Sequence, residues 1–265
     1  MTENLNRAFM YGESVFTTMR MVNSSICDWE YHYDRLSKGI EYVYGPFIEG
    51  QDWHALLKDR LEERLASESG NKIIRLAIYR DAVRGLLKSS IISVHDLKLH
   101  LAINQYDPGM HQNKMKLRTC SAPPRPLWWP SFLKAGNYLE TILAQKIYLK
   151  GDDDDLLFLS NRDTVLETSI ANIFIVKHDN LFTAPLGPHV LDGIMRKKII
   201  EIGGEYFKSV REEETSIEQL LKAEAVFGCN SIRGPFLIEK IDDHEMIYHQ
   251  DFLDKFQKLS DRILK

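Results

Sequence analysis

The stretch 167–196, ETSIANIFIVKHDNLFTAPLGPHVLDGIMR, decides the fold of the second half of the chain. β-forming residues cluster at 172–177 and 181–184 and indicate two strands. Residues 178–180, His-Asp-Asn, are a natural hairpin connection between them. Helical signals then run from Gly193 to Ile202 and stop at a pair of glycines. The stretch therefore predicts a β-hairpin followed by a helix.

The segments around this stretch predict a mixed α/β (α+β) fold rather than a repeating βαβ series. Helical and extended patterns alternate irregularly, and residues 106–112, with Pro108 and Gly109, break both periods. We therefore predict a small N-terminal α/β domain over 1–107 and a larger C-terminal domain over 108–265. The predicted helices are 31–44, 52–67, 135–150, 193–202 and 216–223, and the predicted strands are 72–79, 97–104, 156–160, 172–177, 181–184 and 225–229.

Composition excludes several classes of protein. The 265 residues are 44% hydrophobic, which is enough for well-buried cores, and a formal net charge of -4 provides no basic field for nucleic-acid phosphates. The three cysteines are far apart and not in metal-ligand spacing, which favours a reducing compartment and no metal site. No apolar run approaches the roughly 20 residues of a membrane span, and the N-terminus has no leading apolar core. We expect a cytoplasmic protein that binds neither nucleic acid nor membrane.

Three places carry residues that suit catalysis or ligand binding. Lys134 is predicted at the start of a helix whose apolar residues, such as Leu139 and Ile142, turn inward, and burial would destabilise its ammonium as a Schiff-base lysine requires. Taken alone, the same pattern also fits an exposed lysine. Glu167 lies between two predicted strands, where a buried carboxylate needs a partner. The helix that starts after Gly193 offers free N–H groups that suit a phosphate.

Together these segments closely resemble the class IV aminotransferase family, the fold-type IV enzymes that depend on pyridoxal 5′-phosphate. Residues 133–139, LKAGNYL, resemble the cofactor-lysine segment of the family, and 32–36, HYDRL, resemble its phosphate-arginine segment. The order and spacing of the longer signature are matched by Glu167, Ser169, Asn172, Ile173, Phe174, Leu181, Thr183, Leu191, Gly193, Ile194 and Arg196.

The resemblance implies a role for each matching residue. Lys134 would hold the cofactor as a Schiff base and later carry the proton at the reacting carbon. Glu167 would face the pyridine nitrogen and keep it protonated, which deepens the electron sink. Tyr138 would donate a hydrogen bond to the phenolic oxygen of the cofactor. The phosphate would be held by Arg35, by the backbone N–H groups of Ile194 and Met195 and by the hydroxyl of Ser231.

Two further segments resemble aminodeoxychorismate lyases more than the aminotransferases of the same family. In 7–20, RAFMYGESVFTTMR, Phe-Thr-Thr stands where aminotransferases usually have an acid or an aliphatic residue, and in 227–234, FGCNSIRG, the Asn-Ser pair is followed by Arg-Gly. The resemblance implies conversion of 4-amino-4-deoxychorismate to 4-aminobenzoate and pyruvate. Thr17 or Thr18 would position or protonate the departing group, although each also fits an ordinary strand threonine.

The implied substrate carries two carboxylates and needs fixed positive charge. Arg84 and Arg233 are the candidates, with Asn230 and Ile232 beside them, and Arg20, Arg80 and Arg125 are reserves. An aminotransferase for branched-chain or D-amino acids is the alternative, and a non-catalytic binding relative is a second one. The resemblance also implies a homodimer.

Overall fold

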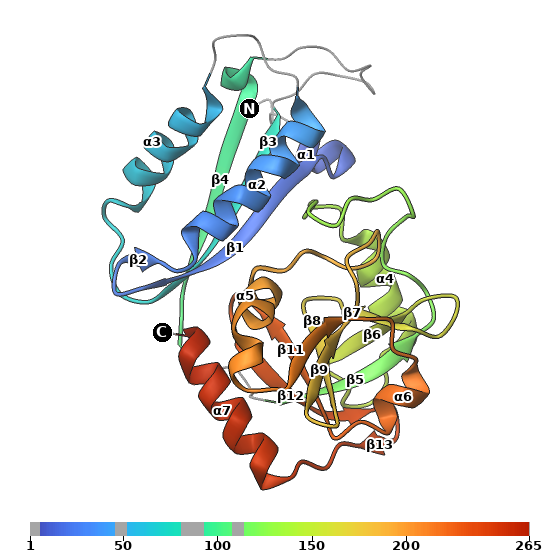
Figure 1. The fold of residues 1–265 in the computed structure, drawn as a ribbon. Coiled ribbons are helices and arrows are strands. Elements are labelled where there is room, and N and C mark those ends of the chain that lie inside the picture. The colour runs from blue at the N-terminus through green and yellow to red at the C-terminus, as the bar shows by residue number, and fades with distance from the viewer. Residues whose placement is uncertain (1–5, 46–51, 81–92, 108–113, 265) are drawn as a thin grey trace. The chain divides into compact units, whose positions relative to one another are not determined.

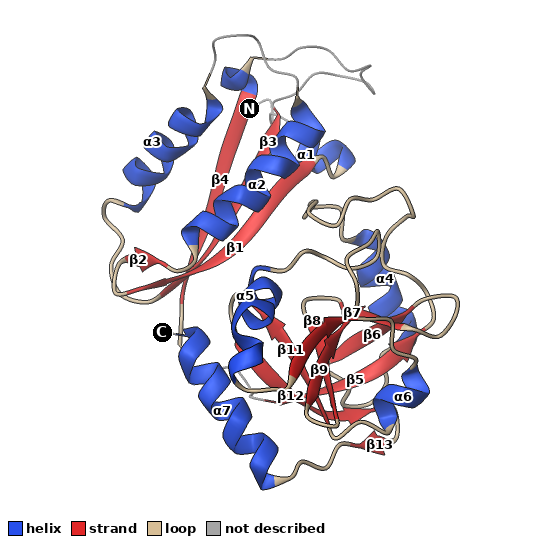
Figure 2. Cartoon of the chain, in the orientation of Figure 1, coloured by secondary structure: helices blue, strands red, loops and turns tan. Residues whose placement is uncertain are grey.

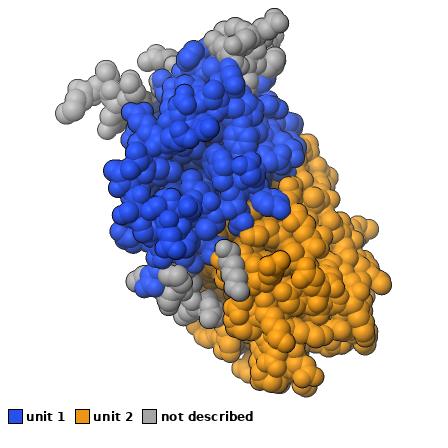
Figure 3. All heavy atoms as spheres, turned by 60° about the vertical axis from the view of Figure 1, so that its left-hand side comes forward, with its two compact units in different colours: residues 1–107, 132–138 blue, residues 108–131, 139–265 orange. Residues whose placement is uncertain are grey.

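The computed structural model describes residues 6–45, 52–80, 93–107 and 114–264. The chain divides into two compact units, coloured separately in Figure 3: unit 1 comprises 1–107 and 132–138, and unit 2 comprises 108–131 and 139–265. Segment 132–138, which the sequence assigned to the C-terminal domain, therefore groups with unit 1. The reason is backbone pairing, since Phe16 N–H donates to the Lys134 carbonyl and Gly136 N–H to the Ser14 carbonyl, both at 2.9 Å.

Unit 1 is a four-stranded antiparallel sheet with two long helices (Figures 1 and 2). The sheet order is β2-β1-β3-β4, and β3 pairs with β4 over its whole length and with β1 from Lys72 to Tyr79. The elements are α1 (Arg7–Tyr11), β1 (Ser14–Val22), β2 (Ser25–Ile26), α2 (Trp29–Tyr44), α3 (Trp53–Leu65), β3 (Lys72–Arg80), η1 (Val94–Asp96) and β4 (Leu97–Gln105).

The two faces of this sheet carry different residues because side chains alternate along a strand. Val15, Thr17 and Met19 of β1 are at most 1% exposed and lie on the face that α2 and α3 cover. Phe16 and Thr18 point to the opposite face, where Thr18 pairs across the sheet with Arg75 of β3. The predicted helices and strands of this unit are confirmed, with ends that shift by one or two residues.

Unit 2 contains a nine-stranded sheet that closes on itself. Its path runs β10-β9-β8-β11-β12-β5-β6-β7, and the ninth strand, β13, pairs with β12. β7 also pairs back to β8 through Glu167 and Asn172. The elements are β5 (Lys114–Cys120), α4 (Leu139–Tyr148), β6 (Asp155–Leu159), β7 (Val165–Thr168), β8 (Asn172–Lys177), β9 (Asn180–Thr183), α5 (Ile194–Ile202), η3 (Gly203–Glu205), β10 (Ser209–Glu212), α6 (Ile217–Leu221), β11 (Ala225–Asn230), β12 (Gly234–Ile241), β13 (His244–Glu245) and α7 (Gln250–Leu264).

Both faces of strand β8 are buried, which explains its unbroken apolar run. Ile173 and Ile175 pack in one core cluster, while Phe174 and Val176 pack in a second cluster with α5 and α7. The hairpin predicted from β8 to β9 is confirmed. So is the capping box of α6, in which Ser216 and Gln219 cap each other. The predicted mixed α/β architecture is thus confirmed.

The prediction for helix α4 is wrong in one respect. The helix begins at Leu139, so Lys134 lies in extended chain before it, and its apolar residues do not turn inward. Leu139, Ile142 and Ile147 are 66%, 56% and 69% exposed, and no residue of α4 is buried. Apolar spacing alone cannot distinguish a helix that packs in its own chain from one whose apolar face stays open. Among the described residues, no helix has the length and hydropathy that crossing a bilayer requires.

Candidate active site

Lys134 lies in an aromatic environment within unit 1. Its Nζ donates to the Tyr138 hydroxyl at 3.1 Å and lies 4.8 Å from the centre of the Phe16 ring. Two residues further on, a Cβ on Gly136 would lie 2.1 Å from Ser14 Oγ, so only glycine lets the segment run this close to β1. The contact between Nζ and the hydroxyl gives the lysine amine a neighbour with which it can exchange a proton.

The two candidate threonines lie on opposite faces of β1. Thr17 is 0% exposed, and its hydroxyl is 2.6 Å from His32 Nδ1 and accepts from Arg35 Nη2 at 3.2 Å. Thr18 lies on the face of Phe16, whose ring contacts Lys134. The strand geometry therefore places Thr18 on the lysine side of the sheet and Thr17 on the helix side.

Arg75 is a cation on the same face that the sequence analysis missed. Its guanidinium stacks 3.7 Å from the centre of the Phe16 ring, and desolvation lowers its pKa. Only the pairing of β3 with β1 places it there, because Arg75 and Phe16 are 59 positions apart in the chain. The alternation of Lys72–Arg80 could have shown that Arg75 faces away from Ile74 and Leu76.

Glu167 is a buried carboxylate within unit 2, and both of its oxygens accept hydrogen bonds. Its Oε2 accepts from the Leu191 N–H at 2.7 Å and from Asn172 Nδ2 at 3.2 Å, and its Oε1 pairs with Arg125 Nη2. The Glu167 side chain is 7% exposed and that of Arg125 is 19% exposed. Arg125, a reserve substrate ligand in the sequence analysis, is thus the ion-pair partner that the buried acid needed.

The start of helix α5 lies beside this acid. Gly193 is the N-cap, no side chain caps the helix, and Ile194 and Met195 are both 1% exposed. A Cβ on Gly193 would lie 2.0 Å from Asn172 Oδ1, so the glycine is required for the close packing of α5 on β8. Backbone N–H groups at such a start attract anions.

The turn after β11 holds the remaining described candidates. The Asn230 side-chain oxygen accepts from the Ile232 and Arg233 N–H groups at 3.0 and 2.9 Å, so it stabilises the turn. Arg233 stacks on the Phe236 ring at 5.5 Å, and Ser231 lies half-buried in the same turn. Arg84 lies outside the described residues.

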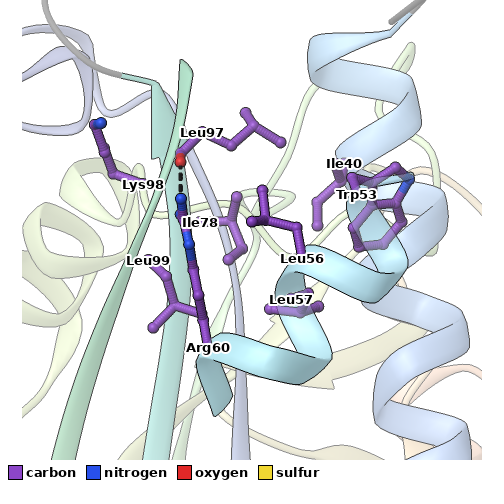
Figure 4. A pocket seen from close by; sticks show the side chains of 9 residues that line it. All are labelled: Ile40, Trp53, Leu56, Leu57, Arg60, Ile78, Leu97, Lys98 and Leu99. Carbon is purple, nitrogen blue, oxygen red and sulfur yellow. Dashed lines mark hydrogen bonds between the residues drawn. The ribbon is translucent and has the colours of Figure 1, made fainter. Parts of the chain in front are cut away.

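Among the described residues, each unit has a cavity of its own. The one in unit 1, between α3 and the sheet (Figure 4), has room for about one water molecule, with a volume of ≈ 20 Å³, and Arg60 crosses it to bond the Leu97 carbonyl. The one in unit 2 has a volume of ≈ 450 Å³, the size of a small-molecule site, and Arg125 and His189 form part of its wall. In the described part of the chain, no group of three or more His, Cys, Asp or Glu residues could hold a metal ion.

The chain belongs to the class IV aminotransferase family, because the model of that family, Amino-transferase class IV, matches residues 14–241. This is a family of pyridoxal-phosphate-dependent enzymes, as the sequence resemblance predicted.

Similar proteins include lyases and aminotransferases. An aminodeoxychorismate lyase of Vibrio harveyi is 26% identical over 86% of this chain and 83% of its own length. A probable branched-chain-amino-acid aminotransferase of Thermotoga maritima is 22% identical over 87% and 78%. The structure of a putative 4-amino-4-deoxychorismate lyase of Legionella pneumophila has a TM-score of 0.78 at 25% identity and covers 97% of this chain and 93% of that one. The fold-type IV prediction is therefore confirmed.

Proposed function

We propose that this protein is an aminodeoxychorismate lyase, which converts 4-amino-4-deoxychorismate into 4-aminobenzoate and pyruvate. The observation that carries the proposal is the position of the Thr18 hydroxyl. Thr18 lies on the same face of the sheet as Phe16, and Lys134 lies over the Phe16 ring. The Vibrio harveyi and Legionella pneumophila relatives support the same activity.

The donor groups present fit pyridoxal 5′-phosphate. Unit 1 supplies a lysine amine beside a tyrosine hydroxyl and a buried arginine, and unit 2 supplies a buried carboxylate and an open helix N-terminus. The resemblance to the family gives each of these residues a role toward the cofactor. Lys134 would attach its aldehyde, Glu167 would hold a proton on its pyridine nitrogen, and Tyr138 would bond its phenolic oxygen. Its phosphate would be held by Arg35, Ser231 and the N–H groups of Ile194 and Met195.

The chemistry then divides between the cofactor and the chain. Bound pyridoxal phosphate supplies an aldehyde that accepts the substrate amine and a pyridinium ring that withdraws electrons from the neighbouring carbon. Lys134 Nζ takes the proton from the ring carbon that bears the amine, and Tyr138 exchanges a proton with Nζ across their 3.1 Å contact. Glu167, held by Leu191, Asn172 and Arg125, stays fixed while charge develops.

Departure of the enolpyruvyl oxygen requires a proton donor and a place for the substrate carboxylates. Thr18 would donate to the leaving oxygen. We add Arg75 to the candidate cations for the carboxylates, because it lies on the same face of the sheet as Thr18 and Phe16. Loss of the ring proton to Lys134 and of the enolpyruvyl group, whose oxygen receives a proton from Thr18, then yields 4-aminobenzoate and pyruvate.

An assay without any keto-acid acceptor tests this function. The purified protein, loaded with pyridoxal phosphate, is given aminodeoxychorismate, and 4-aminobenzoate and pyruvate are quantified. Equal amounts of both products are expected, and Thr18→Val should slow their formation about 100-fold. Absence of both products from a protein that holds the cofactor would refute the lyase assignment.

An aminotransferase for branched-chain or D-amino acids is the second candidate function. The similarity to the Thermotoga maritima branched-chain aminotransferase favours it. The residues would act alike, except that Lys134 would return the proton to the cofactor carbon. Turnover that requires both an amino acid and 2-oxoglutarate would establish this activity instead.

We also propose a cytoplasmic homodimer. Helix α4 and the preceding loop present an apolar surface on which Ile142, Ile147, Leu127 and Trp128 are 56%, 69%, 80% and 70% exposed. Apolar surface of this kind marks an interaction site, and a second copy would cover it. All three cysteines are free thiols, which supports a reducing compartment.

A further inference from the structure

We infer that His32 is a positioning residue for Arg35 and acts through the Thr17 hydroxyl. The inference rests on the proposed function, since the phosphate of the cofactor is the ligand assigned to Arg35. It goes further by giving roles to Thr17 and His32, which neither bind that phosphate nor lie on the lysine face of the sheet.

Two hydrogen bonds join the three side chains. A guanidinium can only donate, so Arg35 Nη2 donates to Thr17 Oγ1 over 3.2 Å. The same hydroxyl lies 2.6 Å from His32 Nδ1 and shares a hydrogen bond with it, in which the tautomer of His32 sets the donor. The chain Arg35–Thr17–His32 is therefore continuous, and the bond to the imidazole nitrogen holds the Thr17 hydroxyl where Arg35 donates to it.

All three side chains are buried. Thr17, His32 and Arg35 are 0%, 1% and 5% exposed. His32 and Arg35 lie three positions apart on α2 and thus on one face of the helix, opposite Thr17 of β1. Replacement of Thr17 or His32 by an apolar group would remove one hydrogen bond from this buried chain.

A neutral partner for Arg35 also has an electrostatic consequence. A carboxylate at position 17 would hold the guanidinium firmly but would neutralise the charge that the phosphate needs. The Thr17 hydroxyl orients Arg35 without neutralising the guanidinium, which can therefore attract an anion. The pair Thr17 and His32 should therefore raise affinity for the phosphate group and for no other part of the cofactor.

The test compares pyridoxal 5′-phosphate with pyridoxal, which lacks only the phosphate. Dissociation constants for both are measured by absorbance on the full-length protein, and unfolding temperatures without cofactor confirm that each variant folds. Thr17→Val removes the hydroxyl and His32→Phe removes the ring nitrogen, both at nearly constant shape. The matched controls are Thr17→Ser, which keeps a hydroxyl, and His32→Asn, which keeps a polar group that can form the hydrogen bond.

Thr17→Val and His32→Phe should each weaken pyridoxal phosphate about tenfold and pyridoxal less than about twofold, because a hydrogen bond to a charged group is lost. Thr17→Ser and His32→Asn should stay within about threefold of the parent protein. If His32→Phe does not fold, the comparison of Thr17→Val with Thr17→Ser decides. Equal weakening of both compounds, or of neither, would overturn the inference. A parent protein that binds neither compound would overturn the cofactor assignment instead.

Discussion

Removal of Arg125 should destabilise the protein, because Glu167 would then be a buried carboxylate without its ion-pair partner. Loss of one partner from a buried ion pair costs about 3–5 kcal/mol. The Arg125 side chain is 19% exposed and Glu167 keeps its two N–H donors, so solvent and these bonds reduce the cost of Arg125→Met to about 2–3 kcal/mol. Replacement of the other partner, Glu167→Gln, should lower the free energy of unfolding by a similar amount. An amide oxygen that accepts from Leu191 and Asn172 leaves the amide N–H groups facing the Arg125 guanidinium.

The double variant shows whether Arg125 and Glu167 stabilise the protein as an ion pair or independently of each other. Thermal unfolding is measured for both single variants and for the double variant, all without cofactor, where each 1 kcal/mol corresponds to a shift of about 2–4 °C. The double variant should be more stable than the sum of the single losses by about 1–2 kcal/mol, since neither charge is then left alone. Strictly additive losses would refute the pairing. Glu167→Gln should also retain the cofactor while turnover falls severely, and unchanged turnover would remove the electron-sink role.

Three further outcomes are expected from the same structure. Lys134→Ala should abolish the cofactor adduct that borohydride fixes on the protein, and a retained adduct in the mass spectrum would exclude Lys134 as the attachment site. Ile142→Glu combined with Ile147→Glu should shift sedimentation from dimer to monomer, whereas an unchanged dimer would place the interface elsewhere. Burial lowers the pKa of His189, so the unfolded chain binds the extra proton first and stability should fall as pH drops below about 6.5. His189→Asn should flatten that part of the curve of unfolding temperature against pH, and an unaltered slope would show that other groups cause it.

Most secondary structure could be predicted from the sequence because local patterns determine it. The run at 172–177 matches β8 residue for residue, and the Ser216–Gln219 capping box starts α6 as expected. The orientation of α4 could not be predicted, since its apolar residues have the same spacing whether they face a core or solvent.

The candidate site shows the same limit. Lys134, Glu167 and Arg35 were recognised by their sequence context, and the structure gives each a defined environment. Arg75 and the Arg125–Glu167 pair were not recognised as such, because strand pairing and loop packing bring together residues that are far apart in the chain.

The sequence by itself determined the family, the order of helices and strands and the identity of the candidate lysine, acid and phosphate-binding segments. These depend on residue type and on spacing over short distances. Tertiary structure alone decided that Thr17 serves Arg35 while Thr18 faces the lysine side, because neighbouring strand residues point to opposite faces and only the packed helix α2 shows which face is which.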